Sequence, residues 1–211
     1  MMAITSSASL CETGKAQSPI NIEGPMHKSA MPLQFDYHAS PLKIANDGHT
    51  VRVRLASGSQ LKIGSQKFRL YQFHFHTPGG DRIGGEEFPM SAHLLHKSDS
   101  GQLLALVVLF RVGAKNQALS ALMPLIPGRA DGDHGHEKIS IDPNTLLPES
   151  RAYYRYTGSL TSAPCTEGVE WIVMNMPVEI SPAQLALYKS KFADNARPVQ
   201  ALNKRIIFEN Q

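Results

Sequence analysis

Long hydrophobic runs and clustered positive charge are both missing from this sequence. The longest apolar run, residues 103–110, has eight residues, whereas a membrane-spanning helix needs about 20. No run of five Lys or Arg residues occurs, although the net charge is +3, and phosphate binding needs clustered positive charge. We therefore expect neither a membrane span nor a nucleic-acid partner.

No signal peptide is recognisable at the start of the given sequence. The segment "MMAITSSASL" has neither the positively charged start nor the apolar stretch that a signal peptide requires. If the protein is exported, we expect this start to be processed or re-engineered. Residues 1–10 are predicted to form a poorly ordered arm.

Cysteine is scarce, with only Cys11 and Cys165 in the chain. Two readings remain open from the residues alone. The cysteines could be free buried thiols, as is usual in a cytosolic enzyme, or they could form one disulfide between the N-terminal arm and a distant loop. Closing so long a loop would stabilise the fold by up to ~5 kcal/mol in the chain-entropy model, and it would imply an oxidising compartment.

Internal repeats, low-complexity tracts and linkers are also absent, and a length of 211 residues suits one large domain. Glycine and proline are scattered and divide the chain into short segments, as in many-stranded sheet proteins. Strands are predicted over residues 42–45, 50–55, 60–63, 67–76, 90–96, 103–110 and 169–174. Strands therefore dominate the predicted structure.

Helical signals are few. In "SPAQLALYKSKF", Ser181 is suited to be an N-cap, Pro182 follows at the first helical position, and Gln184 comes three residues after the cap. Residues 116–123 are predicted to form a second short helix, which Pro124 ends. Both helices are expected at the periphery of the sheet.

Three histidines have the spacing of a metal site. In "YQFHFH", His74 and His76 lie two residues apart and therefore on the same face of a strand. An antiparallel neighbour containing "MSAHLLH" would bring His93 beside them. Zn²⁺ accepts three imidazoles and keeps a fourth tetrahedral position for water, which is a catalytic arrangement. The alternative is a strand that carries histidines and binds nothing specific.

Several motifs, taken together, resemble the α-class carbonic anhydrases, particularly the bacterial ones. They are "CETGKAQSPINI", "NDGH", "QFHFH", "AHLLH", "GSLT", "PCTEGVEW" and "NARPVQ", in this order from Cys11 nearly to the C-terminus. The resemblance implies a mainly β fold in which residues 11–211 form a single domain. That domain would surround a large, mostly antiparallel twisted central sheet with a few peripheral short helices. It also implies zinc at the bottom of a conical cleft and reversible hydration of carbon dioxide to bicarbonate and a proton.

The resemblance assigns roles to particular residues. His74, His76 and His93 match the zinc ligands, and Gln72 matches the glutamine that hydrogen-bonds the first ligand. Thr161 matches the threonine that accepts the proton of the attacking hydroxide, Ser162 stands where a second threonine is common, and His49 matches the proton shuttle. The carbon dioxide pocket would be lined by Leu95, Ala105, Leu160, Val169 and Trp171.

The same resemblance pairs Cys11 with Cys165, because secreted bacterial and plant members have a disulfide at these positions. It therefore implies a periplasmic or secreted protein. It also implies inhibition by sulfonamides and anions, and we expect a homodimer as one possible assembly.

The sequence departs from the family pattern beside the three histidines. Gly79 and Gly80 stand in place of a Ser-Glu pair whose glutamate accepts the threonine's hydrogen bond, and Ser91 replaces the glutamate that supports the third ligand. Losing one such partner typically costs 10- to 100-fold in metal affinity or activity, so we expect reduced or altered efficiency. Glu86 or Glu87 could act as a substitute. The aromatic stretch that normally precedes the first cysteine is missing, which predicts a more open cleft wall.

A zinc-dependent carbonic anhydrase with attenuated activity is therefore the leading hypothesis. The first alternative is a catalytically weak or inactive binding or storage protein on the same fold, which the lost glutamates favour. The second is a zinc hydrolase or lyase redirected to another small electrophile, for which the Gly79-Gly80 floor leaves more space.

Overall fold

The fold of this computed structural model is described for residues 9–128, 134–192 and 194–211. The helices are α1 Leu10–Thr13, α2 Gln117–Leu122 and α3 Pro182–Lys191, with the short 3-10 helices η1 Met123–Leu125 and η2 Pro143–Leu146. The strands are β1 Asn21–Ile22, β2 Met26–Lys28, β3 Leu33–Asp36, β4 Ser40–Asn46, β5 Val51–Arg54, β6 Gln60–Ile63, β7 Gln66–His76, β8 Arg82–Ile83, β9 Met90–Lys97, β10 Leu103–Val112, β11 His134–Ile141, β12 Tyr153–Ser159, β13 Glu167–Met174, β14 Val178–Ile180 and β15 Ile207–Asn210.

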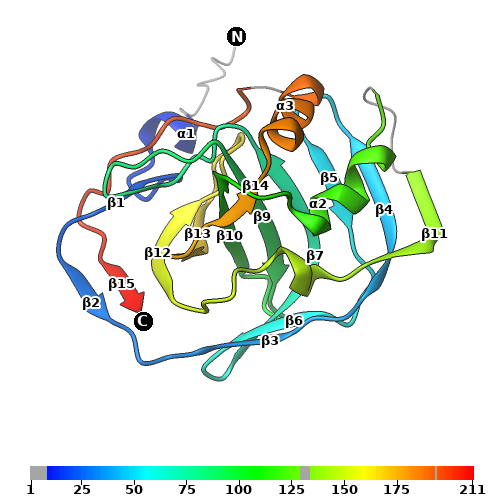
Figure 1. The fold of residues 1–211 in the computed structure, drawn as a ribbon. Helices are drawn as coiled ribbons and strands as arrows, with labels where there is room; N and C mark the ends of the chain where they lie inside the picture. The colour runs from blue at the N-terminus through cyan, green and yellow to red at the C-terminus, as the bar shows by residue number, and fades with distance from the viewer. Residues whose placement is uncertain (1–8, 129–133, 193) are drawn as a thin grey trace, which may run out of the picture.

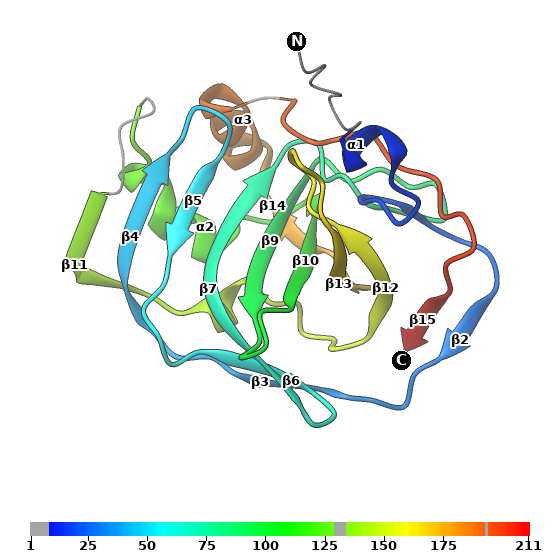
Figure 2. The same cartoon turned by 180° about the vertical axis from the view of Figure 1, so that it is seen from behind.

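Within the described residues, 13 strands form one large twisted sheet (Figure 1). Its main path runs β11-β4-β5-β7-β9-β10-β13-β12-β15-β2, which Figure 2 shows from one edge to the other. Most pairings are antiparallel, and the pairs β10–β13, β10–β14 and β15–β2 are parallel. The predicted mainly β fold with a mostly antiparallel central sheet is confirmed. The N-terminal arm stays a prediction, because residues 1–8 lie outside the described part of the chain.

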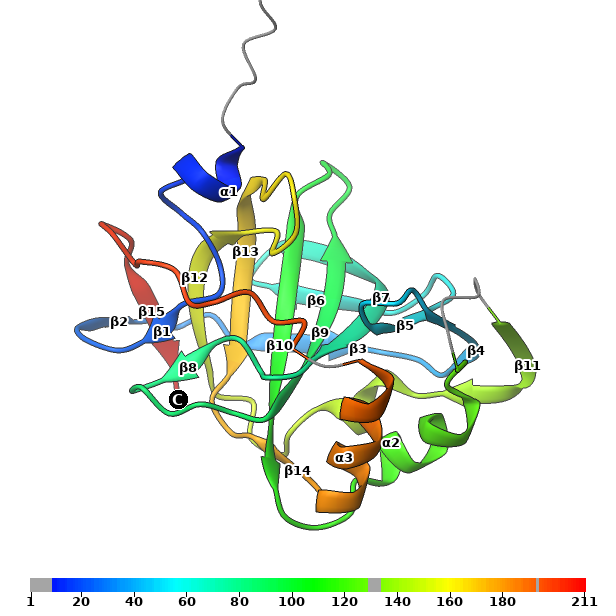
Figure 3. The same cartoon turned by 90° about the horizontal axis from the view of Figure 1, so that it is seen from above.

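The helices lie at the edge of the molecule, as predicted. Ser181 caps α3 by accepting a hydrogen bond from the Gln184 amide, and the Gln184 side chain returns to the Ser181 amide, which confirms the capping box. Asn116 caps α2, and Pro124 lies within η1 directly after it. Figure 3 shows α2 and α3 beside each other, with α1 away from both. None of the described helices combines the length and the apolarity needed to cross a membrane.

The two faces of the sheet are chemically different because side chains alternate along each strand. Phe73 and Phe75 of β7 belong to the larger hydrophobic cluster, which includes Leu119 of α2 and Tyr188 of α3. The Phe75 and Tyr188 rings lie 5.1 Å apart. The smaller cluster includes Val107, Val169 and Trp171 on the opposite face. The histidines of β7 alternate with the two phenylalanines and therefore lie on the face away from α2 and α3.

Candidate metal centre

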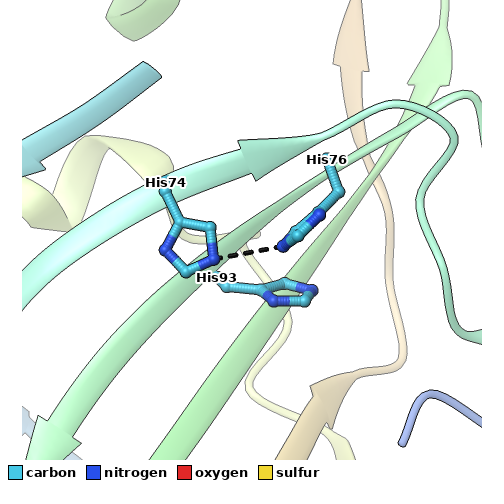
Figure 4. Close-up of side chains that lie close together, drawn as sticks. All are labelled: His74, His76 and His93. Carbon is cyan, nitrogen blue, oxygen red and sulfur yellow. Dashed lines mark hydrogen bonds between the residues drawn. The ribbon is translucent and has the colours of Figure 1, made fainter. Parts of the chain in front are cut away.

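Two neighbouring strands bring the three predicted histidines together. His74 and His76 are two residues apart on β7, and His93 on β9 lies directly opposite His74 in the antiparallel register. One ligand-type nitrogen from each ring lies within 4.8 Å of the others. Figure 4 shows the three rings turned toward one another. The predicted pairing of the strand segments therefore occurs, and its register produces the cluster.

Two hydrogen bonds orient the rings of β7. The Nδ1–H group of His74 donates to Gln72 Oε1 at 2.9 Å, and that of His76 donates to the Asn195 carbonyl oxygen at 3.4 Å. These contacts turn the two Nε2 atoms toward each other, 3.1 Å apart (Figure 4). Gln72 therefore lies where the sequence analysis expected it.

Asn195 is a residue that the sequence analysis did not assign. Its side-chain Oδ1 accepts from the Thr77 amide at 2.8 Å, and its Nδ2 donates to the carbonyl oxygens of His49 and Phe75. The Asn195 side chain thus holds the end of β7 and the loop of His49, and its backbone carbonyl oxygen accepts from the His76 ring. The only sequence signal for it was its place at the start of the "NARPVQ" motif.

His93 and Ser91 form an unsatisfied pair on β9. Both side chains are buried, and neither His93 Nε2 nor Ser91 Oγ has a hydrogen-bond partner among the described residues. The two residues are two apart on one strand and therefore share a face. A carboxylate at position 91 would satisfy the His93 ring, which agrees with the expectation that Ser91 leaves this imidazole without an anionic partner.

Burial keeps all three imidazoles neutral. Desolvation, assisted by the neighbouring His76 and Arg52, lowers the pKa of His74 to about 3. Desolvation lowers the pKa of His76 to about 4, partly opposed by the hydrogen bond to Asn195, and it lowers the pKa of His93 well below its ordinary value. Metal ions bind the neutral form of histidine, so the cluster is ready to coordinate a metal at neutral pH.

The donor set fits zinc. Three neutral nitrogen donors, one from each ring, lie within 4.8 Å of one another. Three imidazoles with an open fourth position are the arrangement of catalytic zinc sites. Among the described residues, this is the one group of three histidine, cysteine or acidic side chains with metal-binding geometry.

The histidines lie in a cleft of about 480 Å³. The cleft is also lined by every residue predicted for the catalytic and substrate sites, namely His49, Thr161, Ser162, Leu95, Ala105, Leu160, Val169 and Trp171. His49 is exposed, whereas Ala105, Val169 and Trp171 are buried. The apolar residues of this set belong to the smaller hydrophobic cluster or pack against it, and they form one apolar wall.

The Thr161 loop is anchored by a disulfide and by hydrogen bonds. Cys11 and Cys165 form the predicted disulfide. The Cys165 amide donates to the Ser162 carbonyl oxygen at 2.8 Å, and the Leu160 amide donates to the Thr166 carbonyl oxygen at 2.9 Å. The Thr161 hydroxyl has no hydrogen-bond partner among the described residues, which is consistent with a missing carboxylate at position 80.

The Gly79-Gly80 turn has a backbone that the family's Ser-Glu pair would not fit easily. Gly80 has φ +87°, a left-handed conformation that favours glycine. A Cβ atom at Gly79 would lie 3.1 Å from the Phe88 carbonyl oxygen. A Ser-Glu pair at this turn would therefore have to adopt a left-handed backbone conformation at position 80 and a tight contact at position 79.

Asp81 follows this turn and was also missed by the sequence analysis. Its buried carboxylate accepts hydrogen bonds from the Ile20 amide at 3.1 Å and from the Tyr156 hydroxyl at 2.9 Å, both through Oδ1. Burial is the main cause that raises the pKa of Asp81, to about 7. Asp81 thus ties the turn to β12, the strand that leads into the Thr161 loop.

Glu86 and Glu87 do not replace the missing glutamates. Both carboxylates are exposed, Glu86 is paired with Arg111 at 3.0 Å, and Glu87 is paired with Arg82. The hypothesis of a substitute carboxylate is wrong, because the loop that carries the two residues turns them outward to surface arginines.

Comparisons with known proteins agree with this geometry. The sequence profile of the eukaryotic-type carbonic anhydrases matches residues 5–211. The chain belongs to the eukaryotic-type carbonic anhydrase family. It is 41% identical to a carbonic anhydrase of Pectobacterium atrosepticum over 94% of this chain and 82% of that protein.

Solved structures of the family superpose closely on this chain. The α-carbonic anhydrase of Thermovibrio ammonificans, in complex with the inhibitor sulfanilamide, has a TM-score of 0.89 and 39% identity over 94% of this chain and 89% of that one. Dioscorin in complex with ascorbate has a TM-score of 0.87 and 33% identity over 95% and 87%. The predicted family is confirmed, and its known structures include complexes with different small molecules.

Proposed function

We propose that the protein is a zinc-dependent lyase that hydrates carbon dioxide reversibly to bicarbonate and a proton. The observation that carries this proposal is the convergence of three imidazole nitrogens within 4.8 Å, in the same cleft as the apolar wall and Thr161. His74, His76 and His93 would hold the metal. When bound in such a site, Zn²⁺ lowers the pKa of water toward ~7 and so supplies a nucleophile at neutral pH.

The apolar wall is proposed to hold carbon dioxide. Carbon dioxide has no net charge and no hydrogen to donate, so burying it against Val169 and Trp171 costs little, whereas water in the same place loses hydrogen bonds. Leu95, Ala105 and Leu160 complete this wall. Trp171 is fixed because its Nε1–H group donates to the Ser159 carbonyl oxygen at 3.0 Å.

Thr161 and His49 are proposed to take part in hydrogen bonding and proton transfer during the reaction. The Thr161 hydroxyl would accept the proton of the attacking hydroxide and so direct a lone pair of the hydroxide toward carbon dioxide. Ser162, the next residue, would take part in the same hydrogen-bond network. His49 lies exposed in the cleft lining, where its imidazole can pass a proton to buffer.

We propose reduced efficiency for two reasons. The Thr161 hydroxyl lacks the carboxylate that would fix its direction, so it can donate to the attacking oxygen as well as accept from it. The His93 ring lacks an anionic partner because Ser91 is neutral and makes no hydrogen bond with the described residues. Each loss is of the kind that typically lowers affinity or activity 10- to 100-fold.

We also propose that the protein works in the periplasm or outside the cell, because a structural disulfide persists in oxidising compartments. Residues 11–211 are proposed to act as one domain. Sulfonamides and anions are proposed as inhibitors, and the homodimer stays a prediction.

A binding protein without catalysis is the second candidate. It is favoured by the absence of both supporting carboxylates, and by the 33% identity to dioscorin, whose solved complex contains ascorbate.

Metal analysis with stopped-flow carbon dioxide hydration tests the proposal. We expect about one zinc per chain and a rate above buffer for the wild type, and loss of both in His93→Ala. His38→Ala, at an exposed histidine paired with Asp36, is the matched control and should keep both. Full zinc content with no acceleration would favour the binding protein. No zinc uptake would refute the proposed zinc-dependent enzyme.

A further inference from the structure

Arg52 carries a positive charge into the cleft. On β5, Val51 and Val53 are buried in the larger hydrophobic cluster, so the alternating side chain of Arg52 lies on the cleft face. Arg52 is directly opposite His74 in the β5–β7 register and lines the same cleft.

The charges around the cleft are few. Among the described residues that line it, Arg52 is the one arginine or lysine and Asp47 is the one carboxylate. The two positions at which the family pattern has glutamates hold Gly80 and Ser91. A dication on the three histidines would therefore leave the cleft with a clear excess of positive charge.

The contact with Asp47 does not satisfy the hydrogen-bond donors of the Arg52 guanidinium. Asp47 already accepts through Oδ1 from the amides of His49 and Thr50, at 2.9 and 2.8 Å. Its Oδ2 lies 3.5 Å from Arg52 Nη1, which is longer than the 2.7–2.9 Å typical of a charge-assisted hydrogen bond. The Arg52 Nε atom is buried and has no hydrogen-bond partner among the described residues, although 29% of the side chain is exposed.

We propose that Arg52 is a specificity-determining residue that makes the cleft a binding site for a small carboxylate-type oxyanion. The planar, positively charged guanidinium fork matches two oxygens of a carboxylate or of bicarbonate. A neutral molecule such as carbon dioxide gains nothing from it. The inference rests on the proposed function for the natural anion, bicarbonate, but the binding site itself does not require catalysis.

This charge has a direct consequence for the proposed reaction. Arg52 stabilises bound bicarbonate relative to bound carbon dioxide, so it lowers the bicarbonate concentration needed to fill the cleft and strengthens inhibition by the product. Removing the charge should raise the inhibition constant of bicarbonate about tenfold, which is the effect of losing one hydrogen bond to a charged group.

Calorimetric titration of the zinc-loaded protein with formate tests the proposal. Formate is an unreactive planar carboxylate, and neutral imidazole serves as the uncharged comparison ligand. Arg52→Gln should weaken formate about tenfold and change imidazole by less than about twofold, while Arg52→Lys should lose about threefold because it keeps the charge without the fork. Arg54→Gln is the matched control: Arg54 is two residues along β5 but outside the cleft lining, and formate affinity should not change.

Asp47→Asn provides a second measurement if Arg52 variants do not fold. The amide keeps the Oδ1 acceptor for the His49 and Thr50 amides and removes the competing charge, so formate should bind more tightly. Zinc content is measured for every variant. Equal formate affinity in wild type, Arg52→Gln and Asp47→Asn would overturn the proposal. A protein that binds formate through Arg52 but does not hydrate carbon dioxide would leave this inference intact and refute the proposed enzyme.

Discussion

Asp81→Asn should make the stability of the protein less sensitive to pH. Asp81 Oδ1 accepts both of its hydrogen bonds, and Oδ2 is buried without a partner among the described residues. Burial outweighs those hydrogen bonds and raises the pKa of this carboxyl from 3.8 to about 7. Ionised Asp81 is therefore costly to the folded state, and asparagine keeps the Oδ1 acceptor without the charge.

The sign and size follow from proton linkage. A pKa that is raised in the folded state adds stability that is fully present below 3.8 and is lost as pH rises through about 7. Between pH 5 and pH 7 this loss is two pH units at 1.36 kcal/mol each, or roughly 3 kcal/mol. The unpartnered amide of asparagine costs about 1–3 kcal/mol, but it does so equally at every pH.

Urea unfolding of both proteins at pH 5, 6, 7 and 8 measures the difference. The free energy of unfolding of Asp81→Asn minus that of the wild type should rise by roughly 3 kcal/mol from pH 5 to pH 8. The buried histidines are common to both proteins, so their contribution to the pH dependence cancels in the difference between the two free energies of unfolding. Asp99→Asn, which removes an exposed carboxylate paired with Arg69, should give a constant difference. Parallel stability curves for Asp81→Asn and wild type would refute the assignment of Asp81 as a costly buried charge.

Two further predictions concern the disulfide and the His93 ring. Replacing Cys11 and Cys165 by serine should lower the free energy of unfolding by up to about 5 kcal/mol, because the bond closes a loop of 154 residues. Denaturation without reductant measures this, and a loss below about 1 kcal/mol would contradict the loop-entropy argument. Ser91→Glu should raise zinc affinity about 10- to 100-fold in a chelator competition, because its carboxylate would accept from the His93 Nε2–H group. Ser91→Ala is its control, and a folded Ser91→Glu protein with unchanged affinity would refute the role given to position 91.

The local sequence pattern was sufficient to predict the helices and strands that are buried and strongly periodic. The alternation in "YQFHFH" predicted β7 and the shared face of His74 and His76, and the capping signals predicted α3. Edge and irregular strands gave no such signal. β11 is almost wholly exposed and has little apolar alternation, so its pairing with β4 is decided by backbone hydrogen bonds that no side-chain pattern encodes.

In the candidate site, too, some residues could be predicted from the sequence and others could not. Spacing and family resemblance identified the three histidines, Gln72 and the disulfide, because each belongs to a recognisable motif. Arg52 lay within the predicted strand at residues 50–55, but the residues that share the cleft with it come from distant segments. Asn195 and Asp81 likewise act through contacts with residues more than 60 positions away.

The amino-acid order alone determined which residues share a strand face, where α3 begins, and which ligand-type side chains are available. Those properties depend on neighbours within a few residues, which interact whatever the rest of the chain does. The β7–β9 register, the outward turn of Glu86 and Glu87, and the burial of the Asp81 carboxylate were decided only by the tertiary structure. Each of these depends on long-range packing, which sets both the distance between side chains and the local dielectric environment that governs their charge.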